Sequence, residues 1–367
     1  MAPSRSERLL NDVVGLVHRR AGARELSAHA ARILGGAVPF EGICIVSMDP
    51  ATLLPTGEFV ENGLPDWAAR RIAEIEIEGS DFNTFQTLAR FTPSVGILSE
   101  TTQGDLDRSV RHRELKRPNG HGDELRAALV TGSTMWGGIS LFRGHRQPNF
   151  TAAEAATIAA VSPYLAEGLR RAQLFTTASE STQDEEAAVG VALVAPDNTI
   201  TEADAAARRW LAELCDGAGQ EALPVAVHTV VSRARRIATG EVSQGMLARS
   251  RVRTGSGQWL LLRGSTLGHG PYGQTALIVE PARPHELAPL IAESYGLTHR
   301  ERCVVQLIAQ GLSTNVIGDR LHLSPWTVQD HLKSIFEKVG VGTRGELVAR
   351  LFFEHYVPSF TRETIRS

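Results

Sequence analysis

Lysine is scarce in this chain of 367 residues, because Lys116, Lys333 and Lys338 are the only three. Arginine therefore supplies nearly all of the positive charge, and the formal net charge is −3. A chain with this balance does not attract polyanions over its whole surface, so any affinity for nucleic acid must come from a local surface. Two of the three lysines lie within six positions of each other, in a stretch between residues 324 and 338 that is discussed below.

Several signatures of export and of cysteine chemistry are also missing. The sequence contains no run of about 18 uninterrupted apolar residues, which a membrane-spanning helix would need. The opening MAPSRSERLLNDVV lacks a signal-peptide core and cleavage site. We therefore expect a cytoplasmic protein that contacts no membrane. Cys44, Cys215 and Cys303 lie far apart and show no zinc-ligand spacing, which favours neither a disulfide nor a zinc site. We expect each cysteine to be a small buried apolar residue.

No catalytic motif is present. The sequence has no nucleophile elbow, P-loop or dinucleotide fingerprint, and it lacks the acidic cluster and later lysine of a phosphate-accepting receiver domain. One charged passage contains residue types that bind metals, but their spacing is irregular: Asp105, Asp107, His112, Glu114 and His121. We therefore expect neither an enzyme nor a metal site, and the sequence identifies no cofactor.

Residues 1–175 have the pattern of an α+β domain. Apolar periodicity predicts two amphipathic helices over 5–38, and the sequence then predicts a strand (GICIVSM), a helix (LPDWAARRIAEIEI) and an irregular charged passage over 82–119. Two antiparallel strands, ELRAALV and MWGGISLFR, follow around the turn TGST. A capping box from Thr151 to Glu154 opens a helix that runs to about Phe175. The phrase GHGDELRAALVTGSTMWGGISLFRGHRQPNFTAAE resembles the GAF sensor domains of bacterial regulators.

The polar and acidic stretch 176–188 has no apolar period, which predicts a linker. Residues 189–283 then show two strands around the turn pair Asp197-Asn198, helices over 203–214 and 224–238, and three further strands. This order resembles a PAS sensor domain. GAF and PAS folds enclose a ligand in many relatives and are empty scaffolds in others, so a small-molecule effector remains open.

Residues 284–367 carry the strongest signals, which are those of short capped helices. Thr298 and Glu301 form a capping box, Gly311 ends the helix that they open, and Ser324 with Pro325 starts another. Further caps are expected at Ser313 and Thr343, and the helix that begins after Ser313 is expected to bury Val316, Ile317 and Leu321. Two short helices with a brief connection describe a helix-turn-helix.

The run LTHRERCVVQLIAQGLSTNVIGDRLHLSPWTVQDHLKSIFEKVGVGTRGELVARLF resembles the LuxR-type helix-turn-helix of bacterial transcription factors. The resemblance implies an all-α domain of four helices behind the two sensor domains. Val316 and Gly318 depart from the glutamate and alanine that are usual in this family. We expect these departures to remove a cap partner and to soften the helix slightly, without loss of function.

The helix that begins at Pro325 has one apolar side, formed by Val328, His331 or Leu332, Ile335 and Val339, which must pack inward. Its other side carries Trp326, Gln329, Asp330 and Lys333. The resemblance implies that this side lies in the major groove, where Gln329 suits adenine, Asp330 accepts from cytosine, and Lys333 donates to guanine. It also implies that Thr327 and Arg344 hold phosphates.

Other interpretations stay open at this point. Gln329 and Asp330 also suit a solvated surface, and Trp326 also suits packing against the sensor domains in an inactive state. Residues 297–351 carry a charge of only +2, which favours a homodimer on two half-sites of double-stranded DNA. The last helix, with Leu347, Leu351, Phe352 and Phe353, serves either as the dimer face or as core. A sigma-like factor that contacts RNA polymerase and an interaction module without DNA binding are the alternative functions.

Overall fold

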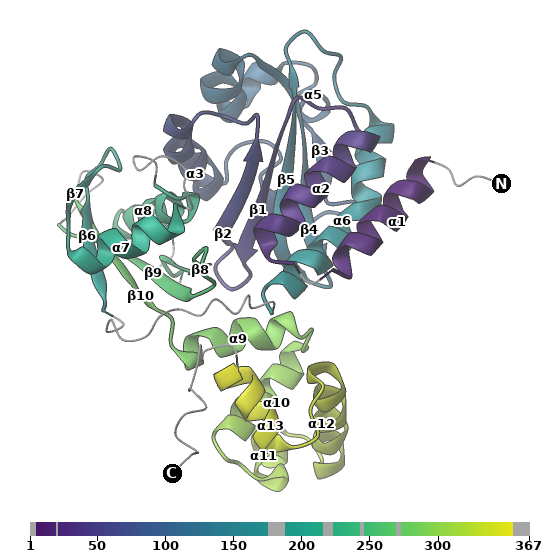
Figure 1. The fold of residues 1–367 in the computed structure, drawn as a ribbon, viewed down its shortest axis with the longest axis vertical. Helices are drawn as coiled ribbons and strands as arrows, with labels where there is room; N and C mark the ends of the chain where they lie inside the picture. Colours follow the sequence, from purple (N-terminus) through teal and green to yellow (C-terminus); the bar gives the residue numbers. More distant parts are fainter. Residues whose placement is uncertain are drawn as a thin grey trace. The chain divides into compact units, whose positions relative to one another are not determined.

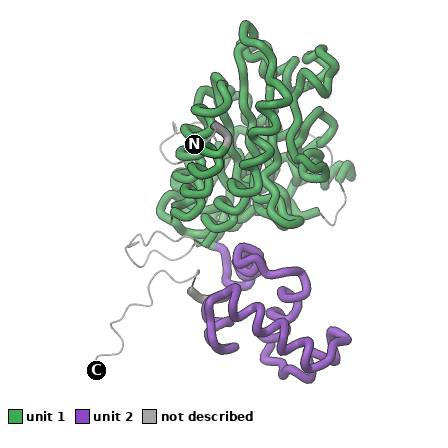
Figure 2. Tube along the Cα trace, turned by 90° about the vertical axis from the view of Figure 1, so that its right-hand side faces the viewer, with its two compact units in different colours: residues 1–175, 184–281 green, residues 176–183, 282–367 purple. Residues whose placement is uncertain are grey.

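The computed structural model describes residues 5–19, 21–174, 188–215, 223–242, 246–268 and 273–354. The chain forms two compact units (Figure 2): unit 1 contains residues 1–175 and 184–281, and unit 2 contains 176–183 and 282–367. Nearly all of the linker predicted over 176–188 lies outside the described residues. Unit 1 combines helices with two antiparallel sheets, and the described part of unit 2 is helical.

The first sheet of unit 1 has five antiparallel strands in the order β2-β1-β5-β4-β3. The strands are β1 (Gly42–Asp49), β2 (Leu54–Glu61), β3 (Val95–Ile97), β4 (His121–Thr131) and β5 (Thr134–Gly144). The hairpin of β4 and β5 confirms the predicted strand pair. Its turn contains Gly132 with φ of +61°, a conformation that glycine adopts at no steric cost.

Three helices cover one face of this sheet (Figure 1): α1 (Arg5–Val17), α2 (Ala23–Ala37) and α6 (Ala152–Ala172). All three confirm the sequence prediction. The Thr151 hydroxyl accepts a hydrogen bond from the Glu154 amide, and the Glu154 carboxylate accepts one from the Thr151 amide, so the predicted capping box is present. This reciprocal capping fixes where α6 begins.

The other face is covered by segments that the sequence analysis predicted as an irregular charged passage. Two short helices, α4 (Phe85–Leu88) and α5 (Leu98–Thr101), and brief 3-10 and π turns lie there, after the confirmed helix α3 (Ala69–Glu78). A Cβ atom at Gly138 would lie 2.4 Å from the Phe85 ring, so this strand position must be glycine for α4 to reach the sheet. Helices of one turn are too short to show an apolar period, which explains why they were missed.

The second sheet repeats the strand order of the first, as β7-β6-β10-β9-β8. Its elements are β6 (Gly190–Val194), β7 (Ile200–Ala203), α7 (Ala205–Leu214), α8 (Val225–Ala238), β8 (Arg249–Arg253), β9 (Trp259–Thr266) and β10 (Thr275–Pro281). These elements confirm the predicted order. Asn198 has φ of +68° in the turn between the first two strands, as its side chain permits.

The two sheets belong to one unit because their blocks share buried contacts. Leu54 and Ile77 of the first block pack into the apolar core of the second. Asp49, at the end of β1, forms a buried ion pair with Arg251 on β8, with 2.7 Å between Oδ2 and Nε. The Ser250 hydroxyl also donates to the Pro55 carbonyl at 3.1 Å. Ionic and apolar contacts therefore join the blocks.

A buried ionic network lies against the first sheet. Arg111, whose side chain is 2% exposed, contacts Asp81 at 3.1 Å and Glu124 at 2.9 Å. Lys116 reaches the same Glu124 carboxylate at 3.3 Å, and Arg126 lies 3.9 Å from it. Burial alone would raise the pKa of Glu124, but Arg111, Lys116 and Arg126 outweigh it and hold the pKa well below the usual range.

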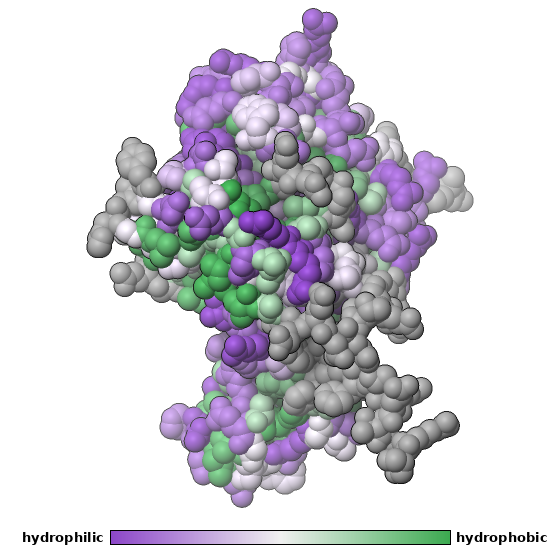
Figure 3. All heavy atoms as spheres, turned by 60° about the vertical axis from the view of Figure 1, so that its left-hand side comes forward, coloured by the Kyte–Doolittle hydropathy of each residue, from purple (hydrophilic) through white to green (hydrophobic). Residues whose placement is uncertain are grey.

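The surface of unit 1 keeps several large apolar side chains. Figure 3 shows such side chains, in green, gathered among polar ones on the face that turns toward the viewer. Among the described residues of the second block, the large exposed apolar side chains are Val189, Val191, Met246, Leu247 and Leu267. Cys44, Cys215 and Cys303 are only partly buried, which corrects the expectation that each is a buried apolar residue. In the described part of the chain, no helix has both the length and the apolar character needed to cross a bilayer.

Candidate nucleic-acid interface

Unit 2 is built from short helices. They are α9 (Pro284–Ser294), α10 (His299–Ala309), α11 (Thr314–Leu321), α12 (Pro325–Val339), α13 (Arg344–Val348) and a π turn over Ala349–Glu354. Helices α10 to α13 confirm the prediction. Helix α9 was not predicted from the sequence.

The caps that were expected from the sequence are present. Thr298 and Glu301 form a reciprocal capping box at the start of α10, and Gly311 has φ of +77° after its end. The hydroxyls of Ser313, Ser324 and Thr343 each accept a hydrogen bond from an amide three residues later. Because each cap fixes the first turn of a helix, these residues set the positions of α11, α12 and α13.

The connection between α11 and α12 is tight. His322 adopts the left-handed conformation, and the Leu323 amide donates to the Gly318 carbonyl at 2.8 Å. A Cβ atom at Gly318 would lie 2.8 Å from the Leu323 carbonyl oxygen, which belongs to the backbone. The sequence led us to expect only a softer helix at this glycine. The structure instead shows that the missing side chain makes room for the turn.

One burial prediction for α11 was wrong. Ile317 is fully buried and Leu321 is partly buried, but Val316 is 41% exposed. Val316 and Ile317 are neighbours on a helix, so their side chains point about 100° apart and only one can face the core. Of the two positions that depart from the family pattern, Val316 therefore lies on the surface, whereas Gly318 is buried.

Helix α12 has two distinct sides. Val328, Leu332, Ile335 and Val339 are buried, which confirms the predicted inner face and selects Leu332 over the partly buried His331. Four exposed residues lie outside this inner face, and we call them the outward strip: Trp326, Gln329, Asp330 and Lys333. Exposed Glu337 extends the strip by one turn and was not predicted.

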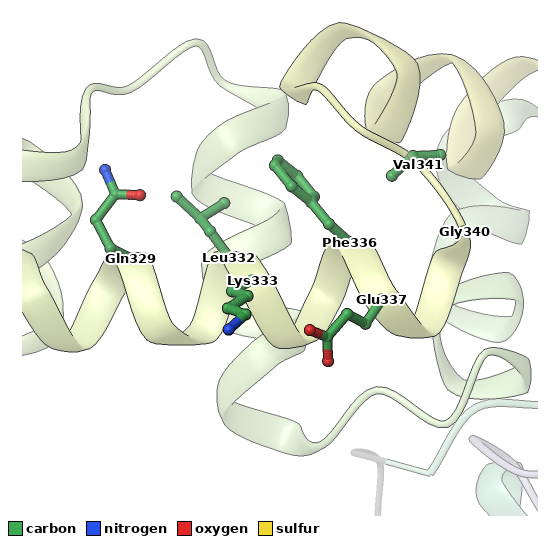
Figure 4. A pocket seen from close by; sticks show the side chains of 7 residues that line it. All are labelled: Gln329, Leu332, Lys333, Phe336, Glu337, Gly340 and Val341. Atoms are coloured by element: carbon green, nitrogen blue, oxygen red, sulfur yellow. The ribbon is translucent and has the colours of Figure 1, made fainter.

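A shallow surface hollow of about 350 Å³ lies along α12 (Figure 4). Gln329, Leu332 and Phe336 point to one side of the helix, whereas Lys333 and Glu337 point to another. The hollow is completed by Gly340 and Val341 after the helix ends. The polar groups of Gln329 and Lys333 therefore stand at the edge of a partly apolar depression rather than on a flat surface.

The two predicted phosphate contacts have internal partners. The Thr327 hydroxyl lies 2.9 Å from that of Ser324 at the start of α12. Arg344 donates to the Leu312 carbonyl at 3.0 Å and to the Thr314 hydroxyl at 2.6 Å. The Gln329 amide also donates to the Thr314 hydroxyl, at 3.5 Å. Arg344 thus connects the start of α13 to the start of α11, a structural role that sequence reasoning missed.

The three lysines have different surroundings. Lys116 is buried in unit 1, and Lys338 forms an ion pair with the buried Glu301 at 2.7 Å. Lys333 has no hydrogen-bond or ion-pair partner among the residues that the structure describes. Of the three lysines, Lys333 is therefore the one whose charge is available to a partner.

Glu301 connects α10 to α12 as well as capping α10. Its carboxylate accepts hydrogen bonds from the Ser334 hydroxyl at 2.7 Å and from Lys338 at 2.7 and 2.9 Å. Burial alone would raise its pKa, but these donors and the Thr298 amide lower the pKa from 4.5 to about 2. The capping box was visible in the sequence, whereas this second use of Glu301 depends on the packing of two helices.

The last helix contributes to the core of unit 2. Leu347 and Leu351 are fully buried, so their side chains are occupied within the chain. Phe352 is partly buried, and the side chain of Phe353 lies outside the described residues. The alternative in which Leu347 and Leu351 form core therefore fits the structure.

The residues considered for a metal site do not gather into one. Asp107 and His112 approach to 3.1 Å in unit 1. The described residues nevertheless contain no group of three or more histidine, cysteine, aspartate or glutamate side chains arranged to hold an ion.

Comparisons with known proteins place the C-terminal helices in a family. Residues 295–351 match the family described as bacterial regulatory proteins, luxR family. The transcriptional regulatory protein UhpA of Escherichia coli is 45% identical over 56 residues, which cover 15% of this chain and 29% of that protein. The transcriptional regulatory protein DesR of Bacillus subtilis is 34% identical over 67 residues, which cover 18% and 34%.

Each of these two matches covers less than a fifth of this chain, and the chain spans about a third or less of the length of these relatives. Among solved structures, a GAF domain/HD domain protein from Geobacter sulfurreducens overlaps 44% of this chain and 99% of its own, with 19% identity and a TM-score of 0.31. A likeness at that level carries no argument about unit 1. The helices over residues 295–351 form a helix-turn-helix of the luxR family, shared with bacterial transcriptional regulators.

Proposed function

We propose that this protein is a homodimeric, sequence-specific transcriptional regulator that acts in the cytoplasm and binds double-stranded DNA through α12. The observation that carries the proposal is the outward strip, in which four side chains stand exposed on the second helix of a luxR-family helix-turn-helix. In such motifs the N-terminal residues of the second helix contact base edges. Trp326, Gln329, Asp330 and Lys333 all lie within the first three turns of α12.

The strip divides into base readers with different hydrogen-bonding capacity. Gln329 donates and accepts, which suits adenine, and Lys333 donates to the acceptors of guanine. Asp330 only accepts when ionised, so it suits the amino group of cytosine and is repelled by phosphates and by bases that offer only acceptors. The acid therefore lowers general affinity and raises selectivity.

Two further residues position the helix on the backbone. Thr327 lies at the N-terminus of α12, where the helix dipole favours an anion, and it has a hydroxyl to donate to a phosphate. Arg344 uses two contacts within the chain and has further N–H groups for a phosphate. Phosphate contacts fix the register and carry no sequence information.

The two blocks of unit 1 act in this proposal as GAF-like and PAS-like sensor domains that modulate the helix-turn-helix. Their sheets share one strand order and a common buried interface, which supports a joint role. Regulation requires a signal that favours one of two conformations over the other. The identity of such an effector stays open.

Selection of bound fragments from random double-stranded DNA tests the proposal with the full chain. We expect one enriched motif with twofold symmetry and half-sites about one helical turn apart, as a dimer requires. Lys333→Ala should relax the choice of base at one position per half-site, at a cost of about 1–3 kcal/mol for the preferred base. Arg344→Ala should weaken binding to all sequences alike.

Asp330→Asn provides the charge test, and Glu337→Gln is its control. Both changes remove one negative charge from the same side of α12, so both should raise affinity for all DNA slightly. Only Asp330→Asn should alter base preference. A chain that selects no motif at any salt concentration would favour the interaction-module alternative, and capture of core polymerase without DNA binding would favour the polymerase-contacting factor.

A further inference from the structure

Trp326 is the most exposed large apolar side chain that the structure describes, at 82%. It is the second residue of α12, directly after Pro325. No hydrogen bond, ring stacking or cation–π contact engages it among the described residues. An indole in this setting has most of its apolar surface in water, and burying that surface against a partner is favourable.

The position of Trp326 on the helix selects the partner. Residues 326, 330 and 333 are four and three positions apart, so their side chains lie along the same side of α12. Trp326 is therefore the first member of the strip that contains the proposed readers of cytosine and guanine. Whatever surface receives Asp330 and Lys333 also receives the indole.

The chemistry of the major groove narrows the contact further. Its base edges present hydrogen-bond donors and acceptors, and the one apolar group among them is the C5 methyl of thymine. Within the outward strip, Gln329, Asp330 and Lys333 are polar, and Trp326 is the apolar member. The polar members of the strip can therefore contact the donors and acceptors of the bases, and the indole can contact the thymine methyl group.

We propose that Trp326 is a specificity-determining residue that packs on the C5 methyl group of thymine in each half-site. The inference rests on the proposed function, because it assumes that α12 enters the major groove. Four residues of helix advance about 6 Å, and two base pairs advance about 7 Å. The thymine therefore lies about two base pairs from the pair that Asp330 reads.

Replacement of thymine by deoxyuridine tests this contact directly, because it removes the methyl group and leaves every hydrogen-bonding group of the base in place. The full chain is titrated with its selected DNA and with duplexes in which each thymine is replaced in turn. At one position per half-site we expect the methyl deletion to weaken binding by about fourfold, which corresponds to one buried methyl group. Other replacements should have little effect.

Two substitutions at the same residue identify the part of the indole that acts. Trp326→Ala should bind thymine and deoxyuridine duplexes equally, because the apolar surface is gone. Trp326→Phe keeps a flat apolar ring and loses the N–H group, so it should retain most of the methyl effect. Trp67→Ala removes another exposed tryptophan, which is 63% exposed in unit 1, and should leave the methyl effect unchanged.

The outcomes separate the inference from the proposed function. Selective binding that ignores every methyl deletion would overturn the role of Trp326 and leave the regulator proposal intact. Equal losses in Trp326→Phe and Trp326→Ala, for thymine and deoxyuridine alike, would mean an N–H contact to phosphate and would also overturn it. Failure to select any DNA would refute the proposed function itself. A Trp326→Ala chain with unaltered selectivity would indicate packing against another part of the protein.

Discussion

The two units of this protein use charged side chains in opposite ways. In the first block of unit 1, Glu124 is buried and is approached by three buried cations: Arg111, Lys116 and Arg126. In the described part of unit 2, Glu301 is the one buried charged residue, and Asp330, Lys333 and Glu337 stand in solvent. The charges in the first block are occupied by contacts within the chain, whereas those on α12 face solvent.

This difference explains why net charge says little about function here. A chain of −3 overall exposes Lys333 on α12, whereas its other two lysines, Lys116 and Lys338, are paired with glutamates. Counting charges over a sequence assumes that each one faces solvent. Buried pairs remove several of them from the field that a partner experiences.

The largest effect is expected in unit 1. Arg111→Met should reduce the free energy of unfolding by about 3–5 kcal/mol, because it leaves Asp81 and Glu124 buried without their shared partner. Denaturant unfolding followed by tryptophan fluorescence measures this change. The control Arg171→Ala removes a pair with Glu167 whose arginine is 49% exposed, and it should cost less than about 0.5 kcal/mol. Similar losses in the free energy of unfolding for Arg111→Met and Arg171→Ala would contradict the difference between buried and exposed charges.

The single buried acid of unit 2 should give a smaller effect. Glu301→Gln should cost about 1.5–3 kcal/mol, since it weakens charge-assisted hydrogen bonds from Lys338 and Ser334. The folded-state pKa is lowered from 4.5 to about 2, so the contribution of Glu301 is present above pH 4.5 and is lost as the pH falls toward 2.

Unfolding of wild type and variant at pH 7, 4.5 and 3 checks this dependence, because other acids titrate equally in both proteins. The difference in stability between them should shrink as the pH falls. Glu337→Gln, at an exposed position of α12, should show no such difference. If the difference in free energy of unfolding between wild type and Glu301→Gln stays constant with pH, the ionised Glu301 carboxylate does not stabilise the fold.

The smallest effect concerns the turn between α11 and α12. Gly318→Ala should gain about 1 kcal/mol of helix propensity and lose slightly more through the clash with the Leu323 carbonyl. We expect a net loss below about 1 kcal/mol. Gly15→Ala, in α1 with open space around it, lacks the clash and should stabilise the protein by about 1 kcal/mol. Equal increases in stability for Gly318→Ala and Gly15→Ala would show that the turn between α11 and α12 can shift to accommodate a Cβ atom without cost.

The elements of the fold that were predictable are those whose signals are local. Capping residues such as Thr151, Thr298 and Ser324 indicate the start of a helix from a motif of about four residues. The glycine-containing turn after β4 indicates a hairpin in the same way. The outward strip of α12 could be predicted in the same way, because one helix period separates its buried and exposed sides. Which base each of its residues contacts stays a prediction.

What could not be predicted depends on contacts between distant segments. The ionic network joins residues 81, 111 and 124, and no periodicity links these positions. Arg344 was predicted from the family resemblance as a phosphate ligand, and its bond to Thr314 appears only when α11 and α13 are packed. The close approach at Gly318 likewise depends on the path of the chain five residues later.

The ion pair of Asp49 and Arg251 has a mechanical consequence. Both side chains are almost wholly withdrawn from solvent, so parting the two sheet blocks would require both charges to be hydrated again while the apolar contacts of Leu54 are lost. A partly separated arrangement of the two blocks would therefore be high in free energy. A movement that separates the two blocks would therefore have to break the ion pair and the apolar contacts together, and smaller movements should carry both blocks along.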